Sequence, residues 1–304
     1  MRDYDNKKGL RSEGSSVNGQ SPVNQLQSMV SDMMGRVGPL AGEWLVAIAV
    51  LTSGLLVNKF VAPHQKLVLT GSDEELSYPM VDQTVTEPVM IAIGLFLPMA
   101  LVVAVCEGVT DRRDMHINAL MLLQSSAVSV FVTTVAKKQA GRPRPNFYAM
   151  CGWNATATGV HGCTAERKWD WESRQSFPSG HSSFAFSGLL FASLFLLEKV
   201  RQLSKKRKLP TSLPMAVAQM AACLPAILAM WVAISRVVDY WHNYDDILAG
   251  SVLGSMCAYH AWTQRMRYNA QWFNDRSAAG GASVSPGDTV GLSGAMDEGG
   301  DSAV

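Results

Sequence analysis

The stretch 235–246 gathers several charged and titratable side chains between two long apolar runs. His242 and Asp246 are four residues apart in it, so their side chains share one face if the chain is helical there. The carboxylate then accepts the proton on one imidazole nitrogen and leaves the other nitrogen free as a nucleophile or base. Arg236 adds a fixed cation. A polar connector between helices is the alternative interpretation, because one His–Asp pair is weak evidence of catalysis.

Two other stretches carry groups that suit a phosphoryl anion. Lys137 and Arg144 lie at the start of a long polar segment, and a guanidinium fork matches the geometry of phosphoryl oxygens. Ser179 and Gly180 immediately precede an apolar run, so we expect their backbone N–H groups to point at an anion from the start of a helix. Together with Arg236, these groups predict an oxyanion-binding site.

Two histidines accompany the predicted anion site: His181 follows Gly180 directly, and His242 belongs to the stretch 235–246. The sequence places no paired carboxylate cluster beside them and offers no third clear metal ligand. We therefore expect neither a metal ion nor another cofactor.

The composition predicts a membrane protein. Of the 304 residues, 48% are hydrophobic, and they are concentrated in blocks close to the roughly 20 residues that a helix needs to cross a bilayer. We predict an all-α bundle of six transmembrane helices at about 42–62, 88–108, 116–136, 181–199, 212–234 and 246–264. The core then covers 41–264, with disordered tails at 1–40 and 265–304. A net charge of +1 argues against a nucleic-acid partner.

The distribution of basic residues predicts the orientation of these helices. Lysines and arginines concentrate in the N-terminal tail, the turn 111–114, the run 199–208 and the start of the C-terminal tail, which the positive-inside rule assigns to the cytoplasm. The segments 63–87, 137–180 and 235–246 then face the lumen or the cell exterior. Cys151 and Cys163 are a candidate disulfide, and Asn154 is a candidate glycosylation site, both in the segment 137–180.

The three motifs, taken together, resemble the signature of a known family. Lys137-x6-Arg144-Pro145, Pro178-Ser179-Gly180-His181 and Ser235-Arg236-x5-His242-x3-Asp246 are similar to the three-part signature of the type 2 phosphatidic acid phosphatase superfamily. The residues around these motifs most resemble the lipid phosphate phosphatase branch. The resemblance covers about 42–264 and leaves both tails unexplained.

The resemblance implies a role for each residue of the motifs. His242 attacks phosphorus to form a phosphohistidine and is oriented by Asp246, while His181 protonates the leaving group and then helps to activate water. The phosphoryl oxygens are held by Lys137, Arg144, Ser179, Gly180 and Arg236. No metal is required. Asp245 competes with Asp246 for the orienting role, and Arg142 has either a supporting or a structural role.

These features predict an integral membrane enzyme, with both termini in the cytoplasm, that hydrolyses phosphatidic acid and related lipid phosphates or pyrophosphates. One alternative keeps the chemistry and changes the substrate to a polyisoprenyl diphosphate, a sphingoid phosphate or a sugar phosphate, since the motifs contact only the phosphoryl group. A second alternative is a non-enzymatic scaffold or transporter of the same fold. The sequence leaves open which membrane is used and whether the chain forms a homo-oligomer.

Overall fold

The computed structural model describes residues 22–66, 68, 73–109, 112–154, 162–207 and 213–279, and the regular elements in these ranges are all helical. The elements are α1 (Pro22–Phe60), the 3-10 turn η1 (Glu74–Leu76), α2 (Glu87–Ile91), the π-helical turn η2 (Ala92–Phe96), α3 (Leu97–Val109), α4 (Arg112–Ala140), α5 (Phe147–Cys151), α6 (Arg167–Ser173), α7 (Gly180–Arg207), α8 (Leu213–Ala221), α9 (Leu224–Val238) and α10 (Tyr244–Ala279). The predicted all-α class is confirmed.

Five helical segments in the described part of the chain are long and apolar enough to cross a membrane: Leu40–Phe60, Glu87–Glu107, Arg113–Ala140, Gly180–Lys205 and Leu213–Val238. They coincide with the first five predicted spans, so the chain is an integral membrane protein. The sixth predicted span, 246–264, lies within α10, which is not among the five.

Both terminal helices extend into ranges for which we predicted disorder. α1 begins at Pro22 and α10 continues to Ala279, whereas residues 1–21 and 280–304 lie outside the described residues. The contacts divide the chain into two units, Met1–Leu45 and Val46–Val304. The predicted site residues all belong to the second unit.

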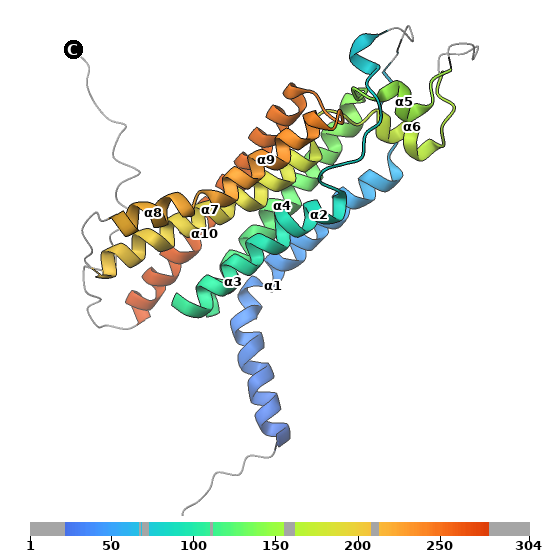
Figure 1. The fold of residues 1–304 in the computed structure, drawn as a ribbon. Coiled ribbons are helices and arrows are strands. Elements are labelled where there is room, and N and C mark those ends of the chain that lie inside the picture. The colour runs from blue at the N-terminus through green and yellow to red at the C-terminus, as the bar shows by residue number, and fades with distance from the viewer. Residues whose placement is uncertain are drawn as a thin grey trace, which may run out of the picture. The chain divides into compact units, whose positions relative to one another are not determined.

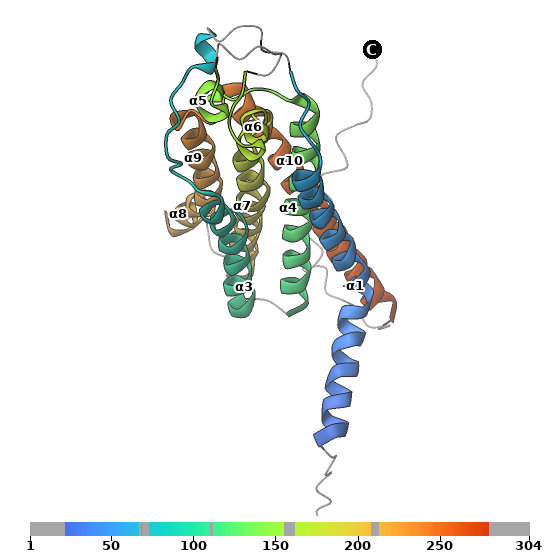
Figure 2. The same cartoon turned by 90° about the vertical axis from the view of Figure 1, so that its right-hand side faces the viewer.

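Within the second unit, α3, α4, α7, α9 and α10 lie side by side, with α5 and α6 beyond one end of the bundle (Figures 1 and 2). Glycines allow close approach of the backbones: a Cβ on Gly250 of α10 would collide with the carbonyl oxygen of Ser179, immediately before α7, and one on Gly254 with that of Ser183 in α7. Since both pairs advance along the two helices together, α7 and α10 run parallel from the same end of the bundle.

At the opposite end of the bundle, a partly buried ion network joins three helices. Asp114 of α4 accepts from Lys199 of α7 at 2.5 Å and from Arg265 of α10 at 3.3 Å, and Arg265 also pairs with Glu198. α10 therefore follows α7 over most of its length, from Ser179 to Glu198. Removing charges from water costs desolvation free energy, which only the attraction between paired charges can offset. Here the two cations face two carboxylates.

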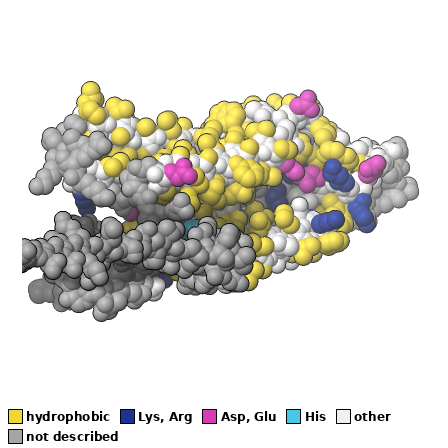
Figure 3. Space-filling model, turned by 90° about the horizontal axis from the view of Figure 1, so that it is seen from below, with side chains coloured by type: hydrophobic (Ala, Val, Ile, Leu, Met, Phe, Trp, Pro, Cys, Tyr) yellow, Lys and Arg dark blue, Asp and Glu magenta, His cyan; other side chains and the backbone are white. Residues whose placement is uncertain are grey.

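The outer surface of the helices is apolar. Along α10, the exposed side chains of Leu248, Val252, Met256 and Tyr259 recur at helical spacing, each more than half exposed. Figure 3 shows one face of the molecule on which hydrophobic side chains predominate, while charged side chains gather near one end. This is the surface expected of helices that contact lipid.

Candidate active site

The structure brings all eight predicted catalytic and phosphate-binding residues to one end of the bundle. They come from the ends of four helices and the segments beside them: Lys137 near the end of α4, Arg144 between α4 and α5, Ser179 before α7, Gly180 and His181 in its first turn, Arg236 near the end of α9, His242 between α9 and α10, and Asp246 in the first turn of α10. Because helices begin or end at or beside these positions, three motifs that are distant in the sequence meet.

His242 and Asp246 form the buried centre of this site. The carboxylate Oδ2 of Asp246 lies 3.7 Å from Nδ1 of His242, and both side chains are almost fully buried. Oδ2 also accepts hydrogen bonds from Ser176 Oγ at 2.6 Å and from the backbone N–H of Asn243 at 2.8 Å. The His–Asp distance exceeds that of a hydrogen bond, and contacts of this kind commonly tighten only when substrate binds.

The guanidinium of Arg144 fixes the tautomer of His242. Its Nη1 lies 3.3 Å from Nε2 of His242 and also donates to the carbonyl oxygen of Trp241 at 3.1 Å. Because an arginine side chain can only donate, Nε2 accepts and carries a lone pair in this contact. The proton is then on Nδ1, which faces Asp246. The imidazole is thus held in the form that a nucleophile requires.

Arg236 and His181 share one backbone acceptor. The carbonyl oxygen of Val85 lies 3.2 Å from Arg236 Nη1 and 3.0 Å from His181 Nε2. Since a carbonyl only accepts, His181 carries its proton on Nε2 in this contact.

Asp239 accepts hydrogen bonds from the side chain and the backbone N–H of Thr84, at 2.7 and 2.8 Å, and so ties the segment before α2 to the α9–α10 connection.

The start of α7 differs from our expectation in one respect. The backbone N–H of Ser179 donates to the carbonyl oxygen of Asp246 at 3.0 Å and is therefore not directed at an anion. Gly180 remains next to a cation, since a Cβ placed on it would lie 3.5 Å from Cε of Lys137. Lys137 Nζ itself donates to the carbonyl oxygen of Gln175 at 2.5 Å. An anion at this helix start would meet Gly180 and Lys137.

Arg142 and Asp245 lie at the rim of the site. Arg142 pairs with Asp245, and its Nη1 also lies 2.8 Å from Oδ1 of Asp246. The side chain of Asp245 is 59% exposed, whereas that of Asp246 is fully buried. Within the described residues, His242 has an ion-pair contact to Asp246 and none to Asp245.

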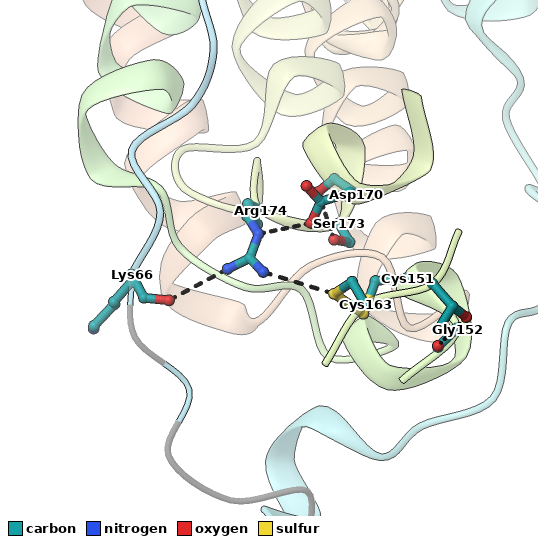
Figure 4. The surroundings of a disulfide bond; sticks show 8 residues. Lys66, Cys151, Gly152, Cys163, Asp170, Ser173 and Arg174 are labelled. Atoms are coloured by element: carbon teal, nitrogen blue, oxygen red, sulfur yellow. Dashed lines mark hydrogen bonds and ion pairs between the residues drawn. A yellow bond between two sulfur atoms is a disulfide. The ribbon is translucent and has the colours of Figure 1, made fainter. Parts of the chain in front are cut away.

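A disulfide joins the last residue of α5 to the residues just before α6, and a buried arginine lies beside it (Figure 4). Cys151 and Cys163 are bonded to each other. Arg174 donates to Asp170 at 2.9 Å and to the carbonyl oxygen of Lys66 at 3.3 Å, and lies 3.6 Å from the sulfur of Cys163. Asn154 is exposed, and the remainder of its predicted glycosylation sequence lies outside the described residues.

Several groups that contact the predicted site residues were not predicted from the sequence. Glu172 binds Arg144, Ser176 binds Asp246, the carbonyl of Val85 binds two predicted site residues, and the ring of Trp241 lies against both Arg144 and Arg236, at 4.9 and 5.3 Å. Trp241 lies within the third motif and Ser176 two residues before the second, so their position was the available signal. Glu172 and Val85 have no local signal, because their contacts join segments far apart in the chain.

Burial and the surrounding cations keep His242 neutral. Burial lowers the pKa of His242 well below its ordinary 6.5, and the charges of Arg144, Lys137 and Arg236 lower it further. As the pH falls through this lowered pKa, the imidazole gains a proton and loses the lone pair on Nε2. We therefore expect the acid limb of kcat/KM for a phosphate-ester substrate to lie below pH 6.5.

The measurement is a pH profile of kcat/KM corrected for the ionisation of the substrate, which 31P NMR titration of the same lipid supplies. The correction is needed because the second ionisation of a phosphate monoester also occurs near pH 6. An acid limb at or above pH 6.5 after this correction would contradict a depressed pKa of His242.

Comparison with known proteins identifies the family. Residues 118–270 match the PAP2 superfamily. Lipid phosphate phosphatases 1 and 2 of Arabidopsis thaliana are 31% and 30% identical to the chain, over 73% of it in both cases and over 67% and 76% of their own lengths. A probable diacylglycerol pyrophosphate phosphatase 1 of Schizosaccharomyces pombe is 29% identical over 73% of the chain and 80% of its own length. No solved structure matches the chain.

The chain belongs to the PAP2 superfamily, which confirms the family predicted from the three motifs. Its relatives named above also support the lipid phosphate phosphatase branch within it.

Proposed function

We propose that this membrane hydrolase removes phosphate from phosphatidic acid and related lipid phosphates or pyrophosphates through a phosphohistidine at His242. The single observation that carries the proposal is the contact of 3.3 Å between Arg144 Nη1 and His242 Nε2. A phosphoryl oxygen bound to that guanidinium would bring phosphorus in front of the imidazole lone pair. The names of the relatives support a lipid phosphate as the substrate.

The first step transfers the phosphoryl group to the enzyme. The Nε2 lone pair of His242 attacks phosphorus, the bond from phosphorus to the ester oxygen breaks, and that oxygen takes a proton from the imidazolium form of His181, which becomes neutral. Lys137, Arg144 and Arg236 balance the charge on the phosphoryl oxygens, and Asp246 stabilises the proton on Nδ1 of His242. Diacylglycerol leaves when the substrate is phosphatidic acid.

The second step restores the enzyme. Water attacks the phosphohistidine while His181 accepts its proton, the bond from phosphorus to Nε2 breaks, and inorganic phosphate is released. His181 Nε2 contacts the carbonyl of Val85, so the imidazole has to turn from that acceptor toward the leaving oxygen in the first step. The three cations supply the charge stabilisation that other phosphatases obtain from metal ions.

We further propose that α10 is a sixth transmembrane helix and that the site is extracytoplasmic. The parallel course of α10 beside α7 and its exposed apolar positions, Leu248, Val252 and Met256, support a sixth span. The disulfide lies at the site end, which fits an oxidising compartment. Arg113 and Lys205 lie at the opposite ends of α4 and α7, as the positive-inside rule requires of the cytoplasmic end.

The experiment is a substrate panel with purified full-length protein in the presence of excess EDTA. Phosphatidic acid, diacylglycerol pyrophosphate, a sphingoid phosphate and a polyisoprenyl diphosphate are compared by release of inorganic phosphate. We expect release from phosphatidic acid to persist in EDTA and to be inhibited by vanadate, which mimics the trigonal-bipyramidal transition state. Absence of release from every lipid would favour the scaffold alternative, and activity restored only by added Mg²⁺ would contradict the mechanism.

A further inference from the structure

The main donor of the phosphate site is already occupied by an acidic side chain. The carboxylate of Glu172 pairs with Nη2 of Arg144, and the backbone carbonyl of the same residue accepts from Nε at 2.8 Å. The Nη1 edge of Arg144 faces His242 and Trp241. A phosphoryl group that binds Arg144 in a bidentate manner therefore has to compete with the Glu172 carboxylate.

The backbone at the end of α6 is held by Arg144, whereas the Glu172 side chain is partly exposed. Arg144 also donates its backbone N–H to the carbonyl of Ser173 at 2.8 Å, which holds the end of α6 in place. The Glu172 side chain is 35% exposed, while that of Arg144 is only 4% exposed. A change of rotamer can thus remove the carboxylate from Arg144 without moving the helix.

A second cation lies within reach as an alternative partner. Lys138 of α4 is 4% exposed, and its Nζ has no hydrogen-bond partner in the described part of the chain. It lies 5.4 Å above the ring of Trp171, the residue before Glu172, and Glu172 is the acidic group whose charge acts on it. A buried ammonium without an acceptor is costly, so Lys138 would be stabilised by receiving the carboxylate.

We propose that Glu172 is a positioning residue that competes with phosphate for Arg144 and moves toward Lys138 when a phosphoryl group binds. In the empty site it neutralises Arg144 and holds Nη1 toward His242. After catalysis it returns to Arg144 and expels inorganic phosphate, which limits inhibition by the product. This inference concerns the same site and rests on the proposed function for its role in turnover.

The test measures binding of inorganic phosphate by isothermal titration calorimetry on full-length protein, and so does not depend on catalysis. Glu172→Gln keeps an acceptor for Arg144 but removes the competing charge, so we expect its Kd for phosphate to fall roughly tenfold. Lys138→Met removes the alternative partner, and we expect its Kd to rise severalfold. Glu166→Gln removes an exposed carboxylate from the N-cap of the same helix and is the matched control, with an unchanged Kd.

A purely structural role of Glu172 predicts the opposite sign, because a loosened Arg144 would bind phosphate more weakly. A Kd for Glu172→Gln that is unchanged or raised in a protein with wild-type thermal unfolding overturns the proposal. An unchanged Kd for Lys138→Met overturns the second position of the carboxylate. If phosphate binds with the expected order but no lipid phosphate is hydrolysed, the proposed function fails while the competition at Arg144 stands.

Discussion

Replacing His242 with alanine is expected to lower kcat on phosphatidic acid by at least roughly 10³-fold, because it removes the proposed nucleophile. The side chain is 2% exposed, and its Nε2 lies 3.3 Å from Nη1 of Arg144, the arginine proposed to bind phosphate. His181, whose Nε2 contacts Val85, is assigned the proton transfers and cannot take over both roles. Initial rates on phosphatidic acid in excess EDTA provide the measurement.

A second readout of the same prediction is the covalent intermediate itself. Rapid acid-free quenching of the wild-type protein with 32P-labelled phosphatidic acid should trap label on one histidine, and His242→Ala should trap none. His260→Ala is the matched control, since this exposed histidine lies on α10 away from the site, and it should retain activity within about twofold. Label in the His242→Ala protein would rule out the proposed phosphohistidine.

The sequence was sufficient to predict the five apolar spans and the groups that meet at their ends, but not α5, α6 or the extension of α1 and α10 into the predicted tails. Apolar blocks of bilayer length identified the first five spans directly. The sixth block is less apolar, because glycines replace large apolar side chains where Gly250 and Gly254 of α10 approach the backbone at the start of α7. A hydropathy average cannot distinguish such a helix from a buried one in a soluble protein, since both lose apolar side chains where backbones approach closely.

The contacts that orient the site residues could not be predicted. The backbone N–H of Ser179 donates to the carbonyl oxygen of Asp246, which is 67 residues later in the chain. Trp241 Nε1 donates to the carbonyl of Val81 at 3.2 Å, and Tyr78 stacks on Tyr240 at 4.8 Å, so the segment before α2 packs on the α9–α10 connection. These pairings depend on the fold of the whole bundle, and no local pattern of residue types indicates them.

The two adjacent aspartates after His242 are expected to differ sharply in their effect on catalysis. Asp246→Asn should lower kcat by roughly 10²- to 10⁴-fold, with little change in KM, because the buried charge that stabilises the proton on His242 Nδ1 is lost. The amide would also present N–H groups to Ser176, Asn243 or Arg142, which all donate to this carboxylate. The pre-steady-state rate of phosphohistidine formation measures the effect directly.

Asp245→Asn is the control from the neighbouring position, and its kcat should stay within about twofold of wild type. Its side chain is 59% exposed and pairs with Arg142, which also donates to Asp246 at 2.8 Å. Neutralising Asp245 leaves Arg142 to Asp246 alone, so the buried carboxylate loses no donor and keeps its position beside His242. Equal losses in the two variants would mean that the aspartates orient His242 jointly, and a larger loss in Asp245→Asn would assign that role to Asp245.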